Sequence, residues 1–172
     1  MNASILGPRH LRSCLSHFVT GVAVVSYRAE GKVRGLTVNS FTSVSLEPPL
    51  ILVSLARSAK AVEHLSRVPF TINVLEASQV DIARQFAGTS RNSVRVEWQS
   101  TGEDLAPTLQ GALATFRCRP WQSYDGGDHM LQLGQVIDAD IHGGGEPLLF
   151  DRGRFVMVGT SGRNKIRGRA AA

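Results

Sequence analysis

The sequence predicts a mainly β fold with short helices, arranged as an antiparallel barrel of the Greek-key type. Roughly seven or eight short segments are rich in β-branched and aromatic residues and are joined mostly by turns. Three short helical segments interrupt them, without the regular alternation of strand and long helix that a doubly wound parallel sheet requires. The 172 residues, of which 42% are hydrophobic, suffice for one domain with one core. A barrel is therefore the expected arrangement for so many short strands.

The N-terminal part is expected to begin with a helix and to continue as a hairpin. Pro8 is typical of a helix start, and four apolar residues then share one helical face: Leu11, Cys14, Leu15 and Phe18. Residues 22–27 form a β-branched run, and a turn at 30–32 leads into a second strand over 33–38. The elements expected next are an alternating strand over 43–46, an extended kink at Pro48-Pro49 and a buried strand over 50–55.

The rest of the chain is expected to hold two capped helices and several strands. Ser58 and Ser78 are the expected N-caps of helices over 59–66 and 78–87, with a strand over 70–75 between them. The pattern weakens between Thr89 and Pro107, which indicates a long loop. The remaining elements expected are strands over 112–119 and 130–141 joined at Gly126-Gly127, a glycine-rich loop over 142–145, and strands over 148–150 and 155–158.

The net charge of +5 is concentrated near the C-terminus. No acidic residue follows Asp151, whereas four cations do so closely together: Arg163, Lys165, Arg167 and Arg169. Without these four charges the chain carries +1, since 5 − 4 = 1. We therefore expect a barrel domain over 1–160 and a basic, disordered tail over 161–172. Nucleic acid is not an expected partner, because the tail has no aromatic residue among its cations.

Signals for export, membrane insertion and metal binding are weak. The N-terminus lacks the basic and apolar regions of a signal peptide, and the apolar runs are too short to cross a membrane, so a cytoplasmic location is expected. Cys14 and Cys118 lack the CxxC spacing of a redox or zinc pair and are expected to be buried thiols. Cys14 and His17 alone do not make a metal site.

Three motifs with a chemical association are rejected. The glycine-rich loop over 142–145 has no GxSxG nucleophile to serve, so a flexible turn is expected there. The segment 159–162 lacks the Gly-Lys-Ser/Thr of a phosphate loop, and no GxGxxG follows a predicted strand. The sequence therefore excludes a Rossmann-type dinucleotide site.

The segment 35–45 is unusual for a structural strand, because small hydroxyl and amide side chains stand between its apolar residues. Two interpretations stay open. Thr37, Asn39 and Ser40 belong to an edge strand with a solvated polar face, or they present donors and acceptors to a planar ligand with polar edges.

Two further segments carry candidate site residues. Ser58 and Lys60 stand at an expected helix start, where they form either a phosphate site or an ordinary N-cap with surface cations. His129 begins a strand after Gly126-Gly127-Asp128. By itself a histidine there is typical of a structural or solvent-facing residue.

Taken in order, these segments resemble the flavin reductase family of two-component monooxygenases. The specific part is the run TVNSFTSVSLEPPL over 37–50 together with GDH at 127–129. The other matching segments are 18–22, 35–36, 73–75, Gln79, 86–87 and 147–149. The resemblance extends from about residue 10 to residue 158 and leaves the tail outside.

The resemblance implies a homodimer with a split-barrel, flavin-binding fold that uses FAD or FMN and NADH or NADPH. The residues implied to bind the flavin are Thr37, Val38, Asn39, Ser40, Ser54, Leu55, Ser58, Lys60, Phe86, Ala87, Gly88 and Arg91. His129 is implied to lie beside the nicotinamide, as is Phe150. Many relatives carry tyrosine at the position of Phe150, so a phenolic hydrogen bond expected there is missing.

The implied activity is hydride transfer from nicotinamide C4 to flavin N5, which supplies reduced flavin to a partner monooxygenase. The protein would contribute position and electrostatics, with backbone N–H donors of 37–40 near flavin N1 and O2. His129 would orient the nicotinamide rather than transfer a proton. The alternative is a non-catalytic flavin carrier of the same fold, and the GDH segment favours the reductase because a carrier needs no nicotinamide groove.

Overall fold

A computed structural model describes residues 7–99 and 105–158 of the chain. The helices are α1 (Pro8–Leu15), α2 (Ala61–Leu65), α3 (Val80–Phe86) and the 3-10 helix η1 (Ala77–Gln79). The strands are β1 (Thr20–Gly21), β2 (Ala23–Ala29), β3 (Lys32–Val38), β4 (Thr42–Leu46), β5 (Pro49–Ala56), β6 (Phe70–Val74), β7 (Trp98–Gln99), β8 (Thr108–Leu109), β9 (Ala114–Gly126), β10 (His129–Ile141), β11 (Leu148–Asp151) and β12 (Arg154–Met157). The expected tail over 161–172 lies outside the described residues.

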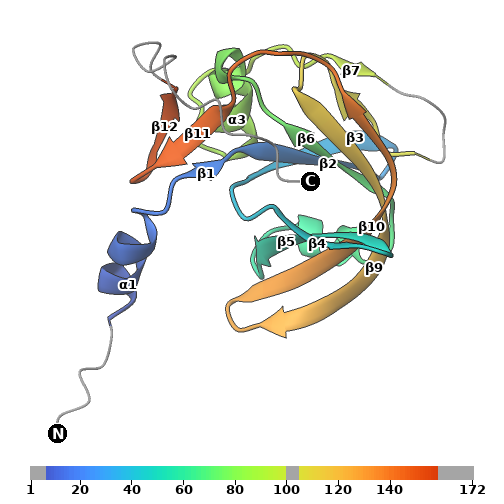
Figure 1. The fold of residues 1–172 in the computed structure, drawn as a ribbon, viewed down its shortest axis with the longest axis horizontal. Helices are drawn as coiled ribbons and strands as arrows, with labels where there is room; N and C mark the ends of the chain where they lie inside the picture. Colours follow the sequence, from blue (N-terminus) through green and yellow to red (C-terminus); the bar gives the residue numbers. More distant parts are fainter. Residues whose placement is uncertain (1–6, 100–104, 159–172) are drawn as a thin grey trace, which may run out of the picture.

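Seven strands form the main sheet, in the order β3-β2-β6-β9-β10-β5-β4, and each neighbouring pair is antiparallel. β3 and β4 follow each other in the chain and yet lie at opposite edges of this sheet. The sheet curls so that β2 and β3 lie above β4 and β5, while the long β9 and β10 bend around one side (Figure 1). The barrel is therefore split between its two edge strands. A small sheet of order β1-β11-β12 lies beside it.

Tight turns set the register of the two main hairpins. Glu30 and Gly31 have φ angles of 53° and 70° between the paired residues Ala29 and Lys32. Two positive φ angles in succession are typical of the type I′ turn, whose twist suits a two-residue hairpin. The β9–β10 turn consists of Gly127 and Asp128, one residue later than the sequence predicts, because Gly126 still pairs with His129.

The core divides into two clusters on the two faces of β2. Val25 and Ile72 lie inside the barrel with Phe70, and all three are 0% exposed. Val24 packs on the other face with Leu75. Successive side chains of β2 point to opposite faces, and both faces are covered by a core cluster. This explains why the strand is a continuous β-branched run rather than an alternation of apolar and polar residues.

Buried polar side chains fix the end of the segment 89–107, whose weak pattern predicts a loop. Ser26 donates to the carbonyl of Pro107 (2.6 Å), and Thr71 donates to that of Ala106 (3.0 Å). Asn73 accepts a hydrogen bond from the backbone N–H of Leu109 (2.7 Å). Because polar contacts rather than a periodic apolar face hold this part of the segment, its sequence shows no pattern of a helix or strand.

Three local predictions are wrong. The apolar face of α1 is not buried, because Leu15 is 64% exposed and Cys14 is exposed with it. Ser58 does not cap α2, whose N-cap residue is Lys60 and makes no capping hydrogen bond. Ser78 lies inside η1, and the backbone N–H at the start of that turn is instead satisfied by Gln79.

Candidate functional site

The segment between β3 and β4 crosses the split in the barrel. Ladder pairs end at Val38 on β3 and begin at Thr42 on β4, so residues 39–41 belong to neither ladder. The Ser40 hydroxyl donates to the carbonyl of Ser54 (2.8 Å) and accepts from its N–H (3.1 Å). A side chain thus takes the place of a backbone partner and ties the crossing segment to β5.

The side chain of Thr37 is also engaged inside the protein. Its hydroxyl donates to the carbonyl of Ala83 in α3 (2.8 Å). The hydroxyl protons of Thr37 and Ser40 are thus used inside the protein, so these two side chains could contact a ligand only as acceptors. Asn39 differs, since it is exposed and its amide makes no hydrogen bond to any other described residue.

A cleft of about 140 Å³, which we call the Asn39 cleft, brings several predicted residues together. Its lining consists of Val22, Thr37, Val38, Asn39, Ala87, Phe150 and Phe155. The rings of Phe150 and Phe155 lie 5.3 Å apart and form an aromatic wall. The cleft is mostly apolar with one free amide at its rim, which suits a flat ring with polar edges. Val22 and Phe155 are members that sequence reasoning missed.

A second hollow of about 290 Å³, the Lys60 cavity, lies on the other face of β3. It is lined by Arg34 and Lys60, and by the rings of Tyr27 and His64, whose centroids lie 5.6 Å apart. Glu30 forms an ion pair with Arg34 (3.3 Å) and leaves Lys60 as the cation without an acidic partner among the described residues. Such a lining can hold an anionic group.

β3 lies between the Asn39 cleft and the Lys60 cavity. It has a neighbouring strand on one side only, so every second residue directs its N–H and C=O groups out of the sheet. Both the edge-strand interpretation and the ligand interpretation of 35–45 thus agree with its place in the fold. A ligand lying along this edge would have a hollow on each side of the strand.

His129 lies at the tip of the β9–β10 hairpin, beside the end of β5. Its Cα pairs with Ala56, and its ring Nδ1 lies 2.7 Å from a carboxylate oxygen of Asp128. The hydrogen bond from His129 lowers the pKa of the Asp128 carboxyl, with a small contribution from Arg12 in α1. With a proton on Nδ1 donated to this carboxylate, Nε2 is the ring atom left to accept a hydrogen bond.

His129 is also close to the crossing segment. Ser40 stands opposite Ser54, and His129 stands opposite Ala56, two residues further along β5. Strand spacing and rise per residue place the Cα atoms of Ser40 and His129 about 12 Å apart. One extended ring system can span that distance.

Other predicted residues lie elsewhere. The Leu55 side chain is 2% exposed in the core, which leaves only its backbone near the surface. The Phe86 ring packs against Gly35 and Trp98 and is not in the lining of the Asn39 cleft. Arg91 lines a separate hollow of about 370 Å³ beside α3. Ser58 is exposed, and Gly88 ends α3 with a φ of 70°.

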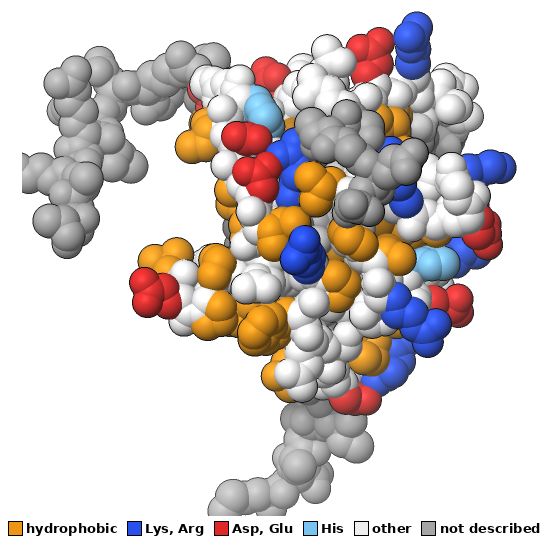
Figure 2. Space-filling model, turned by 90° about the vertical axis from the view of Figure 1, so that its right-hand side faces the viewer, with side chains coloured by type: hydrophobic (Ala, Val, Ile, Leu, Met, Phe, Trp, Pro, Cys, Tyr) orange, Lys and Arg blue, Asp and Glu red, His pale blue; other side chains and the backbone are white. Residues whose placement is uncertain are grey.

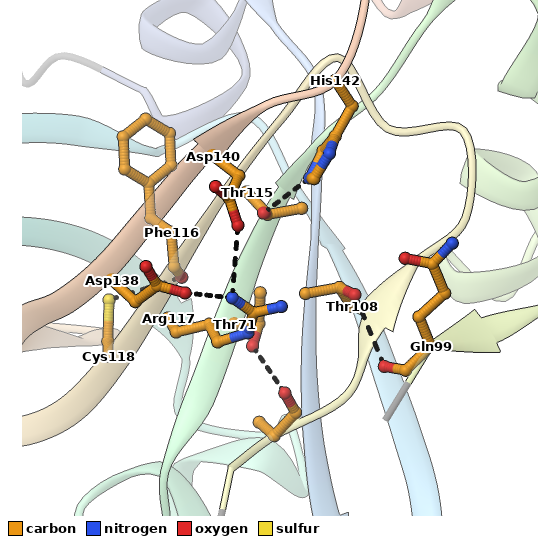
Figure 3. Close-up of polar contacts among 11 residues, drawn as sticks. Thr71, Gln99, Thr108, Thr115, Phe116, Arg117, Cys118, Asp138, Asp140 and His142 are labelled. Carbon is orange, nitrogen blue, oxygen red and sulfur yellow. Dashed lines mark hydrogen bonds and ion pairs between the residues drawn. The ribbon is translucent and has the colours of Figure 1, made fainter. Parts of the chain in front are cut away.

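A polar cluster on β9 and β10 is separate from these hollows (Figure 3). Arg117 forms ion pairs with Asp138 and with Asp140 (3.4 Å) although its own side chain is only 9% exposed. Thr115 and His142 form a hydrogen bond at the end of the same strands (2.9 Å). These contacts join the two strands beside the register shift between Val136 and Asp138 and serve the fold.

Two classes of site are not found in the described part of the chain. It holds no group of three or more His, Cys, Asp or Glu side chains that could bind a metal ion. Among residues 7–99 and 105–158, no helix is long and apolar enough to span a membrane.

Comparison with known proteins identifies the family. Residues 15–159 match the model of the flavin reductase like domain. The FMN reductase (NADH) SmoA of Agrobacterium fabrum is 39% identical over 86% of this chain and 84% of its own length. The reductase component of 4-hydroxyphenylacetate 3-monooxygenase from Thermus thermophilus is 34% identical over 86% of this chain and 95% of its own length.

A solved structure has the same fold. The NADH:FAD oxidoreductase SgcE6 of Streptomyces globisporus C-1027, in complex with NAD and FAD fragments, superimposes with a TM-score of 0.82. It is 38% identical, and the match covers 93% of this chain and 99% of that one. The predicted split barrel is thereby confirmed. The chain belongs to the flavin reductase family.

Proposed function

We propose that this protein is a flavin reductase that takes hydride from NADH or NADPH and supplies reduced FAD or FMN to a partner monooxygenase. The observation that carries the proposal is the Asn39 cleft at the edge of β3, where Asn39 and Ala87 lie together with the ring of Phe150. The bound flavin would supply the redox chemistry by accepting hydride at its ring. A monooxygenase partner is supported by the name of the Thermus thermophilus relative, a reductase component.

The residues present fit a flavin in three respects. Phe150 and Phe155 offer an apolar wall for a ring, and the Asn39 amide offers a donor and an acceptor for its polar edge. The segment 39–41 stands outside both ladders, so its backbone N–H groups are available for negative charge on a ligand. Lys60, on the other side of β3, would hold a phosphate group.

His129 would bind the nicotinamide side of the reaction. With Nδ1 held by Asp128, the ring can accept a hydrogen bond at Nε2 from a carboxamide N–H. We infer an orienting role, because aligning two rings at contact distance is the main demand of hydride transfer. No proton transfer through His129 is required.

We also propose that two copies form a homodimer. Large apolar side chains lie at the surface on several elements, and Figure 2 shows such side chains among charged ones on one face. The most exposed are Leu46 at the end of β4 (89%), Ile141 at the end of β10 (88%) and Phe18 between α1 and β1 (78%). Exposed apolar surface of this kind supports a protein interface. Light scattering of the purified protein should give twice the chain mass of 18.6 kDa.

The decisive experiment mixes the purified protein with NADH or NADPH and with FAD, FMN or riboflavin in turn. Loss of the nicotinamide absorbance band that depends on added flavin supports the reductase. Protein that retains flavin but oxidises neither nucleotide is a carrier, and protein that neither binds nor reduces flavin overturns the proposal.

A variant of His129 tests its assignment. His129→Ala should raise the KM for the nicotinamide nucleotide and leave flavin binding intact, because the residue lines neither the Asn39 cleft nor the Lys60 cavity. Unchanged kinetics would remove His129 from the site.

Lys60 is tested by comparing two flavins. Lys60→Ala should weaken the binding of FMN with little effect on riboflavin, which has no phosphate. Lys32→Ala removes the same charge from an exposed position on β3 that does not line the cavity, and serves as the control. Equal losses for both flavins would argue against a phosphate contact.

A further inference from the structure

Arg57 connects two parts of the proposed site. It directly follows β5, in the same stretch as Ser58 and Lys60, and reaches the tip of the β9–β10 hairpin. Its backbone N–H donates to the carbonyl of Asp128 (3.1 Å), and its Nε–H donates to that of Gly127 (2.6 Å). Its guanidinium group also forms an ion pair with Asp125. The side chain of Arg57 thus holds Asp125 and Gly127, while its backbone holds Asp128, which directly precedes His129.

The hairpin tip is organised around these contacts. The second carboxylate oxygen of Asp125 accepts the backbone N–H of Gly127 (2.9 Å). This hydrogen bond, followed by the contact with Arg57, holds the pKa of the Asp125 carboxyl below its usual range. Asp125 therefore remains charged at neutral pH, and together with Arg57 it holds the backbone of Gly127 at both its N–H and its C=O.

The contacts of Arg57 fix the geometry of the hairpin tip more than they stabilise the fold. Its side chain is 45% exposed and that of Asp125 is 78% exposed, and exposed ion pairs contribute little to folding. The guanidinium nevertheless makes its bonds in a fixed plane, which restricts the direction of the groups it contacts. Asp128, which holds the His129 ring at Nδ1, is bound through its own carbonyl to the backbone of Arg57.

We propose that Arg57 is a positioning residue for His129. It fixes the hairpin tip so that Asp128 keeps the imidazole in one orientation, with Nε2 directed to the nicotinamide. The inference rests on the proposed function, because the role of His129 does. It also gives Arg57, which stands close to Ser58 and Lys60 in the chain, a role other than binding the flavin phosphate.

The test measures steady-state kinetics of five single variants and one double variant. Arg57→Ala should raise the KM for the nicotinamide nucleotide roughly three- to tenfold, as expected for a displaced orienting group, with the affinity for FMN unchanged. Arg57→Lys should give an intermediate value, because lysine keeps the ion pair but lacks the planar set of donors. Asp125→Asn should change the KM in the same direction as Arg57→Ala.

Arg67→Ala is the matched control. Arg67 is exposed after α2 and does not contact the hairpin tip, so its removal changes the net charge equally and should leave the KM unchanged. Exchange of the Gly127 amide proton, followed by NMR, should accelerate in the Arg57 and Asp125 variants and stay constant in the control. This readout does not depend on activity.

The double variant distinguishes positioning from direct binding. A residue that acts through His129 has no further effect once that ring is gone, so Arg57→Ala should not raise the KM of His129→Ala. A further rise of three- to tenfold in that background would overturn the inference, as would a loss of FMN affinity with riboflavin unaffected. If His129→Ala alone has no effect, the role assigned to His129 fails first.

Discussion

The hydroxyl of Ser40 continues the β4–β5 ladder beyond its last backbone pair, because it bonds both the N–H and the carbonyl of Ser54. Thr42 pairs with Leu52, so Ser40 and Ser54 are the next partners in the same register. This contact bridges the crossing segment and β5 beside the exposed Asn39. The geometry of the proposed flavin site therefore depends on a side chain.

Replacing Ser40 should affect both stability and flavin affinity. Ser40→Ala removes two hydrogen bonds in a half-buried place and should lower the free energy of unfolding by about 1–2 kcal/mol. The KM for flavin should rise, because residues 39–41 lose their anchor. Ser43→Ala, on the exposed part of β4, is the control for urea unfolding. Equal midpoints for the two variants would contradict the bridging role.

Gly35 is required by the close approach of α3. A Cβ atom at Gly35 would lie 2.6 Å from the ring of Phe86. Gly35→Ala should therefore displace that ring and destabilise the protein by about 1–3 kcal/mol, as overpacking does. Gly21→Ala is a control with open space around the new atom. The double variant Gly35→Ala/Phe86→Leu should recover part of the loss in thermal unfolding, and no recovery would place the strain elsewhere.

Asn73 should be among the least tolerant polar residues. Its amide is 0% exposed, donates to the carbonyl of Val24 (2.8 Å) and accepts from the N–H of Leu109 (2.7 Å). Asn73→Ala leaves buried partners without hydrogen bonds and should cost about 3 kcal/mol. Denaturant unfolding measures the loss, with the exposed Asn92→Ala as the control. A loss no larger than that of Asn92→Ala would show that water can replace the amide.

The two thiols should differ in reactivity and in their effect on stability at high pH. Cys14 is exposed, whereas burial raises the pKa of the Cys118 thiol to about 12 from 9.0. A disulfide reagent should titrate one thiol in the native protein and two after unfolding, and none in native Cys14→Ser. Two fast native thiols would contradict the burial of Cys118.

The sign of the pH effect follows from the raised pKa of Cys118. The folded state keeps the proton that the unfolded state releases above pH 9, so this contribution to stability is lost as pH rises from 9 toward 12. The free energy of unfolding should therefore fall more steeply between pH 9 and about 10.5 in the native sequence than in Cys118→Ala. Parallel slopes would exclude the contribution.

The sequence predicts the strands well where apolar or β-branched residues follow one another. The hairpin of β2 and β3 is confirmed with its turn at Glu30-Gly31, because turn chemistry and strand propensity are local properties. The caps at Ser58 and Ser78 are wrong, since several nearby polar side chains could serve equally well and only the backbone geometry selects among them. The apolar face of α1 is exposed for a similar reason. Helical spacing predicts that apolar residues share a face, but it does not determine whether another element covers that face.

The residue pattern alone predicts the mainly β fold, the absence of a Rossmann motif and the segments expected to carry the site. These follow from periodicity, turn residues and a long specific run. Three other features could not be predicted from that pattern. The Thr37 and Ser40 hydroxyls donate to carbonyls inside the protein, Asn39 and Lys60 lie on opposite sides of one edge strand, and Arg57 holds the loop beside His129. The physical reason is that these contacts join residues far apart in the chain, and their partners are set by how the sheet curls.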